Sequence, residues 1–256
     1  MLGTVGDMRA GDSQVTRQAP GKTGTMTFNP SLGFWQRLGW LPVRLFVRTA
    51  WRVRVEGLDQ VKRLPGNVIF AGNHVSAFDP LLLATCLPLT SGKLPVVFVT
   101  HERQAYLKSA QTWRRHFYGR KFFKMLGGYP AYAGANDYSR ALRDHLAALE
   151  AGRSVCIFPV GSLHSLDRIT EARGGVSYLA KETDLPVIPF KIEGAMWHAR
   201  PIDHLRRRPK LDVLFGEPLR AQDIFDCPLA EVKQSDREKF RRASVELMRR
   251  LSNLRP

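Results

Sequence analysis

Short apolar runs separated by segments of helical periodicity are the feature that most limits what this chain can fold into. Four runs, at 67–71, 95–100, 154–159 and 186–192, are rich in β-branched residues and nearly unbroken, as in strands buried on both faces of a sheet. Segments 80–87 and 138–151 between them are predicted helices. This alternation predicts an α/β fold, in which a mainly parallel sheet is flanked by helices.

Two further segments extend this pattern. In 138–151 the apolar residues recur three and four positions apart, and Gly152 is a plausible end for that helix. Residues 211–215 form another predicted strand. Residues 235–253 form a predicted helix, for which Ser235 and Glu238 have the spacing of a capping box.

The charge of the chain indicates the kind of partner. The 256 residues include 39 Lys and Arg against 23 Asp and Glu, a formal net charge of +16. Such an excess predicts an anionic partner, namely acidic lipid, a phosphorylated substrate or nucleic acid. We divide the chain into a mobile extension at 1–28, an amphipathic membrane-interface segment at 29–54 and the main domain at 55–256.

The segment at 29–54 mixes aromatic and basic residues at roughly helical spacing. Its large apolar members and its arginines are Phe34, Trp35, Leu38, Trp40, Leu41, Leu45, Phe46, Trp51, Arg37, Arg44, Arg48, Arg52 and Arg54. Indole rings at headgroup depth, with guanidinium groups reaching outward, suit a helix in a lipid interface. Periodicity does not show what the apolar face meets, so a helix packed on the domain and broken by Pro42 stays open.

Cysteine usage and hydropathy indicate the compartment. The three cysteines, at 86, 156 and 227, form no CxxC pair, which argues against a disulfide scaffold and a structural zinc site. No stretch of 18 residues is free of charge, and the first thirty residues lack the apolar core of a secretory signal. We expect a peripheral or monotopic protein at the cytoplasmic face of a membrane.

The residues directly after the first buried run are the main catalytic candidates. Residues 72–80 read Gly-Asn-His-Val-Ser-Ala-Phe-Asp-Pro, with His74 five positions before Asp79. Functional groups gather at the carboxyl ends of strands, and a carboxylate that fixes an imidazole makes it a general base. An N-cap role would also explain Asp79, and this spacing alone is weak evidence.

Three further blocks accompany this one. They are Phe-Pro-Val-Gly-Ser at 158–162, Arg-Gly-Gly at 173–175, and Val-Ile-Pro-Phe at 187–190 followed by Ile192 and Gly194. In order and separation, residues from about 55 to 194 resemble the lysophospholipid (1-acylglycerol-3-phosphate) acyltransferase superfamily. The hallmark of that superfamily is an Asn-His-x4-Asp block, here Asn73, His74 and Asp79.

The resemblance implies transfer of a fatty acyl group from acyl-CoA or acyl carrier protein to a lipid hydroxyl, that of lysophosphatidate or a related lysolipid. His74 would be the base and Asp79 its orienting partner, with no metal or organic cofactor. The substrate-binding candidates are Asn73, Ser76, Gly161, Ser162, Arg173 and Gly174. The backbone N–H groups at 161–162 are candidates for an oxyanion contact, and a plain turn is the alternative.

Three departures from the family pattern concern the acceptor. Ala133 and Leu163 stand where arginines are usual, and Val160 replaces a glutamate. Neither alanine nor leucine can supply the guanidinium fork that suits a phosphate. Either the acceptor is an aminolipid or glycolipid without that phosphate, or other cations take over. The candidate cations are Arg120, Lys121, Lys124, His164, Arg168 and Arg173.

Two other functions stay open. The departures are compatible with a lipid-binding relative that has no activity, although the His74/Asp79 pair argues against it. Nucleic-acid binding rests on charge alone, because no helix-turn-helix, zinc-finger or RNP motif is present. The basic clusters at 114–115, 206–208 with Lys210, and 241–242 with 249–250 favour an anionic membrane surface as partner over nucleic acid or a merely solvated face.

Overall fold

A seven-stranded sheet forms the centre of the described part of the chain, which is residues 31–76, 78–100, 126–132, 137–162, 165–194 and 206–255 of a computed structural model. The strand order is β1-β7-β6-β2-β5-β3-β4. The strands are β1 (Arg52–Glu56), β2 (Ile69–Gly72), β3 (Val96–Thr100), β4 (Gly128–Pro130), β5 (Ser154–Ile157), β6 (Val187–Gly194) and β7 (Lys210–Phe215).

Strand direction divides the sheet into two parts. Strands β4, β3, β5, β2 and β6 run parallel to one another. Strand β7 is antiparallel to β6, and β1 is parallel to β7. The starts of β1 and β7 therefore lie at the same edge as the carboxyl ends of the other five strands. The mostly parallel sheet confirms the predicted fold class.

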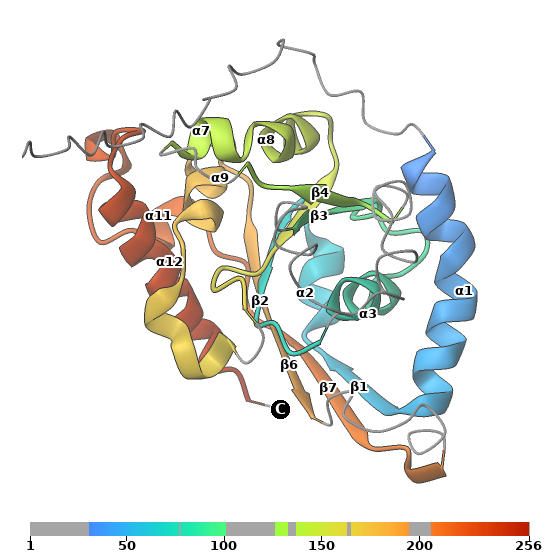
Figure 1. The fold of residues 1–256 in the computed structure, drawn as a ribbon. Coiled ribbons are helices and arrows are strands. Elements are labelled where there is room, and N and C mark those ends of the chain that lie inside the picture. The colour runs from blue at the N-terminus through green and yellow to red at the C-terminus, as the bar shows by residue number, and fades with distance from the viewer. Residues whose placement is uncertain are drawn as a thin grey trace, which may run out of the picture.

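Helices cover both faces of the sheet (Figure 1). On one face lie α1, α2 and α3, and on the other lie α7, α8, α9, α11 and α12. The α-helices are α1 (Leu32–Ala50), α2 (Leu58–Arg63), α3 (Asp79–Cys86), α7 (Tyr138–Ala141), α8 (Arg143–Glu150), α9 (Gly175–Thr183), α11 (Ala221–Ile224) and α12 (Arg237–Ser252). Two 3₁₀ segments are η1 (Ser165–Glu171) and η2 (Leu229–Glu231).

The central strands supply the core on both faces. On β2, Ile69 and Ala71 belong to the cluster that includes residues of α8, α9, α11 and α12, whereas Phe70 faces α1, α2 and α3. These side chains are fully buried. The unbroken apolar runs of the sequence arise because the strands are covered on both sides.

The five predicted strands are found, with ends that shift by one or two residues. The three-residue β4 and the charged β1 were not predicted, because neither has an apolar run. The predicted helix at 138–151 is divided at Leu142 into α7 and α8, and Gly152 follows at a φ of 75°. The capping box was wrong: α12 is preceded by Asp236, with no side-chain cap hydrogen bond.

Helix α1 carries the amphipathic pattern, and it continues through Pro42, so the break that the alternative placed there does not occur. Pro42 is exposed, which lets water satisfy the carbonyl left without an N–H partner. The helix ends at Ala50, and the predicted interface segment passes into β1 at Arg52. The extension at 1–28 lies outside the described residues.

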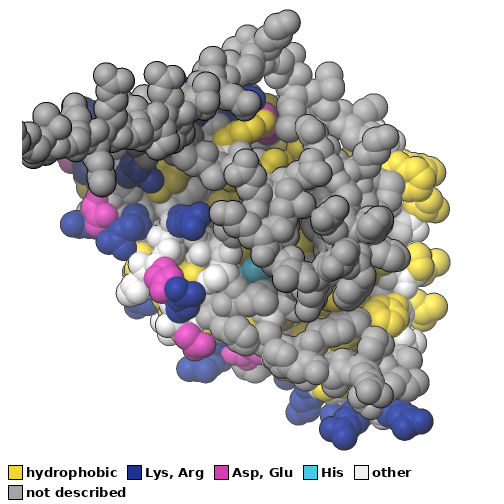
Figure 2. Space-filling view, viewed as in Figure 1, with side chains coloured by type: hydrophobic (Ala, Val, Ile, Leu, Met, Phe, Trp, Pro, Cys, Tyr) yellow, Lys and Arg dark blue, Asp and Glu magenta, His cyan; other side chains and the backbone are white. Residues whose placement is uncertain are grey.

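One side of α1 is apolar and exposed, and apolar side chains line that flank of the molecule (Figure 2). The exposed members are Phe34, Trp35, Leu38, Leu41, Leu45 and Phe46, and we call them the apolar stripe. On the inner side, the Trp40 indole donates to the Leu87 carbonyl at 2.9 Å, which fastens α1 to the end of α3. Within the described residues, α1 and the other helices are too short or too polar to cross a bilayer.

Candidate active site

The site is built on the loop that leaves β2 at Gly72 and enters α3 at Asp79. A side chain at position 72 would meet the Phe190 ring, whose nearest atom would lie 2.2 Å from the added Cβ. Glycine therefore lets the Phe190 ring pack against the end of β2. His74 is the second residue beyond the strand, at the carboxyl edge where α/β proteins place their functional groups.

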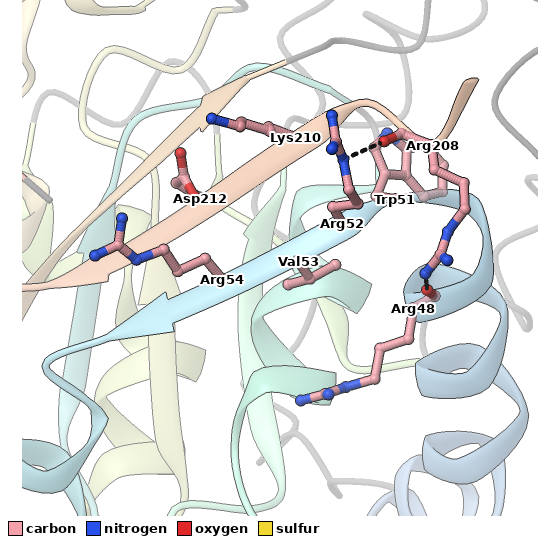
Figure 3. Close-up of a pocket in the computed structure, with 8 residues that line it drawn as sticks. All are labelled: Arg48, Trp51, Arg52, Val53, Arg54, Arg208, Lys210 and Asp212. Atoms are coloured by element: carbon pink, nitrogen blue, oxygen red, sulfur yellow. Dashed lines mark hydrogen bonds between the residues drawn. The ribbon is translucent and has the colours of Figure 1, made fainter.

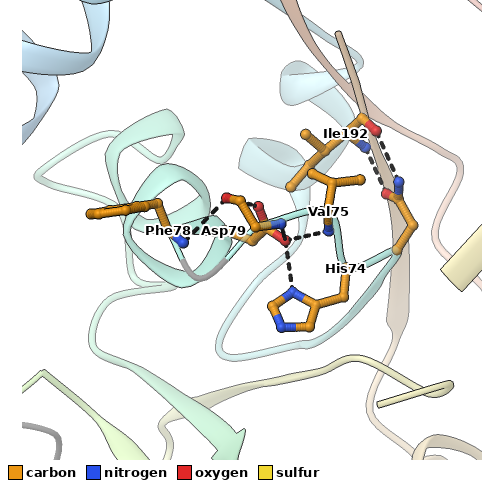
Figure 4. A network of polar contacts seen from close by, with 7 residues as sticks. His74, Val75, Phe78, Asp79 and Ile192 are labelled. Atoms are coloured by element: carbon orange, nitrogen blue, oxygen red, sulfur yellow. Dashed lines mark hydrogen bonds and ion pairs between the residues drawn. The ribbon is translucent and has the colours of Figure 1, made fainter. Parts of the chain in front are cut away.

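His74 and Asp79 are hydrogen-bonded, with 2.7 Å between His74 Nδ1 and Asp79 Oδ2 (Figure 4). The side chain of Asp79 is 1% exposed and that of His74 is 22% exposed. The predicted pairing is therefore present, with the carboxylate inside and the imidazole reaching the surface. The catalytic roles of the two residues stay predictions.

Asp79 is held by the loop itself. Its Oδ2 also accepts the backbone N–H groups of Val75, at 2.7 Å, and Ser76, at 2.9 Å. Its Oδ1 accepts the Ser76 hydroxyl at 2.7 Å. Asp79 lies in the first turn of α3, with Pro80 following it, so its negative charge is also favoured by the helix dipole. These contacts fix the carboxylate before any substrate arrives.

This arrangement determines the tautomer of His74. A carboxylate oxygen that receives two backbone N–H groups acts as an acceptor, so Nδ1 is the ring nitrogen that donates to it. Nε2 then carries the lone pair, and it lies on the opposite side of the ring from Asp79 (Figure 4). An imidazole in this state is able to take a proton from a hydroxyl.

Phe158 is a part of the site that sequence reasoning missed. Its ring stacks on the His74 ring with centroids 4.4 Å apart and planes 20° apart. Phe158 in turn meets Phe190 edge to face at 6.2 Å. The imidazole is therefore held between a hydrogen bond and an aromatic face. The sequence signal for Phe158 is the block at 158–162, in which only Gly161 and Ser162 were predicted to contact substrate.

Asn73 and Ser76 hold the site together from within. The Asn73 side chain exchanges two hydrogen bonds with the Ile192 backbone, donating at 2.8 Å and accepting at 2.7 Å. Asn73 is fully buried, so it fastens the end of β2 to β6. These contacts give Asn73 and Ser76 a structural part in the site, and the substrate contacts predicted for them stay predictions.

The segment at 158–162 contains a tight turn. The Gly161 N–H donates to the Phe158 carbonyl at 3.0 Å, and φ at Gly161 is 71°. This bond fits the plain-turn alternative, and the oxyanion contact stays a prediction. Ser162 follows it, and its hydroxyl oxygen is buried without a hydrogen-bond partner among the described residues.

Val160 packs into a small apolar core. It is 6% exposed and clusters with Ala172, Met248 and Leu251. The loss of the family's glutamate at this position is therefore accommodated by packing. It does not by itself argue against a phosphate on the acceptor. Ala133 and Leu163, the other two departures, lie outside the described residues.

Gly174 and Arg173 lie at the start of α9. A Cβ on Gly174 would lie 2.5 Å from Phe240 Cβ, and the Gly174 N–H donates to the Tyr138 hydroxyl at 3.0 Å. Gly174 therefore allows close packing of α9 on α12, and the substrate contact predicted for it stays a prediction. The Arg173 side chain is exposed.

The structure describes two of the six candidate cations, Arg168 and Arg173. Arg168 pairs with Glu171 at 2.7 Å, which leaves Arg173 as the less committed of the two. Arg120, Lys121, Lys124 and His164 lie outside the described residues. The part of the chain that the structure describes holds no group of three His, Cys, Asp or Glu side chains placed to bind a metal ion.

Comparisons with known proteins agree with this geometry. Residues 52–193, more than half of the chain, match the family model named Acyltransferase. The chain belongs to the acyltransferase family. The matched region contains the β2–α3 loop, Phe158 and all of β6 up to Glu193, so the whole His74 site lies inside it.

Two relatives are informative. The chain is 24% identical over 163 residues to a probable 1-acyl-sn-glycerol-3-phosphate acyltransferase of Mycoplasma pneumoniae, covering 63% of this chain and 56% of that protein. It thus spans a little over half of the relative's length. The crystal structure of the 1-acyl-sn-glycerophosphate acyltransferase PlsC from Thermotoga maritima matches with a TM-score of 0.50 and 18% identity, over 86% of this chain and 83% of that one. This match shows a shared fold.

Proposed function

We propose that the protein transfers a fatty acyl group from an acyl thioester to the hydroxyl of a lysolipid. The observation that carries the proposal is the 2.7 Å hydrogen bond between His74 Nδ1 and a carboxylate that is 1% exposed. It orients an imidazole at the carboxyl edge of the sheet as a general base. Membership of the acyltransferase family supports the reaction class.

The reaction needs one base and a thiol leaving group. The lipid hydroxyl oxygen attacks the thioester carbonyl carbon as His74 Nε2 takes the hydroxyl proton. Asp79 stabilises the imidazolium that forms, since its carboxylate already accepts from Nδ1. The tetrahedral intermediate then collapses with cleavage of the carbon–sulfur bond, and the thiolate recovers the proton from the imidazolium. The products are the acylated lipid and the free thiol.

Direct attack is favoured over an acyl-enzyme intermediate on Cys86 or Cys156. Burial raises the pKa of the Cys86 thiol to about 12. Burial, and secondarily the charge of Asp79, raises the pKa of Cys156 well above its usual value. The reactive form of cysteine is the thiolate. Both of these residues are therefore unsuited to act as nucleophiles.

For the acceptor we propose lysophosphatidate, the monoacyl glycerol phosphate to which the names of both relatives refer. An aminolipid or glycolipid is the second candidate, because Ala133 and Leu163 replace the usual arginines.

We further propose that the enzyme works at the cytoplasmic face of a membrane, with the apolar stripe of α1 in the lipid interface. Six large apolar side chains exposed on one side of one helix support this placement. Co-sedimentation with vesicles containing phosphatidylglycerol tests it. Recovery of the protein in the supernatant at every lipid concentration would contradict it.

Turnover of a lipid panel tests the reaction. The protein is incubated with radiolabelled palmitoyl-CoA or palmitoyl-acyl carrier protein and with lysophosphatidate, a lyso-aminolipid or a monoacylated glycolipid. We expect acylation of lysophosphatidate, and a fall of about 10²- to 10⁴-fold in kcat for His74→Ala. Thermal melting controls for folding of the variant.

Each outcome of this experiment has a separate meaning. Turnover of the aminolipid or glycolipid alone would replace the proposed acceptor and keep the reaction. Full activity of a folded His74→Ala variant would exclude the mechanism. Lipid binding without turnover of any acceptor would leave the alternative of a relative that binds lipid without catalysis.

A further inference from the structure

A second polar site lies at the edge strand of the sheet, where α1 passes into β1. It is a pocket of about 430 Å³. Its lining comes from the end of α1, from β1, and from the start of β7 (Figure 3). The lining residues are Arg48, Trp51, Arg52, Val53, Arg54, Arg208, Lys210 and Asp212. We call it the cationic pocket.

The strand register explains why the cations gather. Arg52 pairs with Lys210 and Arg54 with Asp212 across the parallel strands. Residues two apart on a strand point to the same side, so these four side chains share one face of the β1–β7 ribbon. Val53, on the opposite face, packs against the core.

The pocket has an unbalanced charge. Its lining includes five Lys or Arg side chains and one carboxylate, that of Asp212. Among the described residues, the ion pair recorded for a lining cation is that of Arg54 with Glu56. By contrast, Arg241 and Arg242 on α12 share Glu238, while Arg249 and Arg250 share Glu246. All four of these α12 arginines are thus paired with carboxylates, whereas among the pocket cations this holds for Arg54.

Backbone carbonyls orient two of the guanidinium groups. Arg52 Nε donates to the Arg208 carbonyl at 3.0 Å, and the Arg208 guanidinium donates to the Arg48 carbonyl at 3.0 Å. Arg208 has a φ of 41°, in the left-handed region that disfavours residues with a side chain. These contacts hold the two guanidinium groups in place, and within the described ranges neither group has a carboxylate partner, as suits a preformed anion site.

The pocket adjoins the apolar stripe of α1. Phe46, one of the exposed members of the stripe, meets Trp51 edge to face at 6.0 Å, and Trp51 lines the pocket. Leu45 and Phe46 lie less than one turn before Arg48. In Figure 2 the basic side chains at the lower end of the molecule continue from the apolar flank. An apolar surface thus leads directly into a cationic one.

The pocket shares an edge with His74 but is separate from it. Gly72 of β2 pairs with Phe190 of β6. Four residues farther along β6, Gly194 pairs with Leu211 of β7, which in turn pairs with Val53 of β1. With about 3.3 Å per residue and about 4.8 Å between strands, Arg52 lies roughly 20 Å from Gly72.

We propose that the cationic pocket binds the phosphate headgroup of an anionic membrane phospholipid, whose acyl chains lie along Leu45 and Phe46. A free phosphate would use only the cations, whereas a phospholipid is complementary to the cations and the adjoining apolar stripe. The proposal goes beyond the acyl transfer proposed above, because it concerns a separate site and needs no turnover.

Calorimetric titration of the full chain with dihexanoyl phosphatidylglycerol, below its micelle concentration, tests this assignment. We expect the double variant Arg52→Gln, Lys210→Gln to bind about 30-fold more weakly, since each cation at an anionic lipid surface contributes appreciably. The matched control is Arg63→Gln, Lys233→Gln, which removes two exposed cations elsewhere and is expected to bind within twofold of the parent. Equal affinities of the two double variants would overturn the proposal.

A single variant keeps the test decisive if the double variant does not fold. Arg48 is exposed at the last turn of α1, and Arg48→Gln is expected to bind the lipid about fivefold more weakly. An unchanged affinity of this variant would also overturn the proposal. Thermal melting identifies variants whose fold is lost.

Two further ligands identify the source of the phosphate. Glycerophosphoglycerol, the same headgroup without acyl chains, is expected to bind at least tenfold more weakly than the lipid. If it or CoA binds the pocket as tightly as the lipid does, the site serves a water-borne phosphate and the lipid assignment fails.

Failure of this proposal is distinguishable from failure of the acyltransferase mechanism. His74→Ala is expected to bind dihexanoyl phosphatidylglycerol like the parent, because the two sites are apart. A parent protein that binds this lipid but turns over no acceptor would sink the acyltransferase proposal and keep the pocket, whereas normal turnover by a parent whose lipid binding is insensitive to Arg52 and Lys210 would do the reverse.

Discussion

Two histidines in the described part of the chain lie close to strands, and their surroundings give them opposite characters. His74 sits past the end of β2, reaches the surface, and meets a carboxylate through Nδ1. His145 is fully buried in α8, where Nε2 bonds to the Tyr129 carbonyl at 3.1 Å. Burial lowers the pKa of His145 to about 4, against the opposing effects of that carbonyl and of Asp144.

The difference shows how position in the fold selects the use of an imidazole. A ring at the carboxyl edge, with an ionised partner on one nitrogen, is prepared to gain a proton on the other. A ring inside a helix–sheet interface is kept neutral, because a buried charge there is costly. Sequence spacing alone separates these cases poorly, since each histidine has an aspartate nearby in the chain.

Replacing Asp79, the carboxylate partner of His74, should have the largest effect on activity. In Asp79→Asn the side chain loses its negative charge and keeps one acceptor oxygen, so it can no longer stabilise an imidazolium at His74 or accept on both of its terminal atoms. We expect kcat to fall about 10²- to 10⁴-fold. Steady-state kinetics with the acceptor identified above provides the measurement.

The matched control for this variant is His145→Gln, assayed at pH 7.5. It changes the buried imidazole and should keep kcat within about threefold, since it leaves the β2–α3 loop intact. If Asp79→Asn were as active as this control, the carboxylate would have no role in orienting the base.

The second histidine should instead control stability at low pH. The folded-state pKa of His145 is depressed to about 4, against about 6.5 in the unfolded chain. Between about pH 6.5 and pH 4, His145 is protonated in the unfolded state but stays neutral in the folded state. Stability from this group is therefore present above pH 6.5 and is lost as the pH falls toward 4, by up to about 3 kcal/mol.

Urea unfolding at pH 7 and at pH 4.5 measures this loss. The parent should lose about 2 to 3 kcal/mol more than His145→Gln over that interval, because glutamine does not titrate and its amide can still donate to the Tyr129 carbonyl. Parallel losses in the two proteins would show that other groups dominate the acid sensitivity.

A smaller effect is expected from the hydroxyl that supports Asp79. Ser76→Ala removes the 2.7 Å bond to Oδ1 but leaves three bonds to Oδ2. Loss of one hydrogen bond to a charged group should lower kcat about tenfold, with KM unchanged if Ser76 does not touch substrate. Ser76→Thr should restore kcat, and a raised KM in Ser76→Ala would assign Ser76 to substrate binding.

Much of the fold was predictable because its strands are buried on both faces. Runs such as 154–159 contain too little polarity to be anything but core, and their alternation with helices leaves few arrangements. The exceptions have a physical reason. Strand β1 has the sequence Arg-Val-Arg-Val-Glu, and it pairs at the sheet edge, where one face is exposed and alternation replaces an apolar run.

The site was predictable where it is local in sequence and not where it is assembled across the chain. The pairing of His74 with Asp79 spans five residues, and a strand end followed by a helix start brings them together. The stacking of Phe158 on His74 joins residues 84 positions apart. Gly161 and Gly174 match family blocks, and their parts in the turn and in the α9–α12 packing could not be read from the sequence because both depend on contacts with other segments.

The cationic pocket shows the same limit. Our division at residue 54 separated Arg52 and Arg54 from Lys210, although strand pairing brings them together. The residues at 206–210 are recognisable in the sequence as a basic cluster. Their proximity to the arginines of α1 and β1 depends on the pairing of β7 with β1.

The reversal of direction between β6 and β7 has an evolutionary consequence. Because two strands enter the sheet at the rim where five others leave it, this rim is supplied by chain segments that share no residues with the loop bearing the base. If both proposals hold, mutations in those segments could change which lipid surface the protein binds and leave the acyl transfer at His74 unchanged.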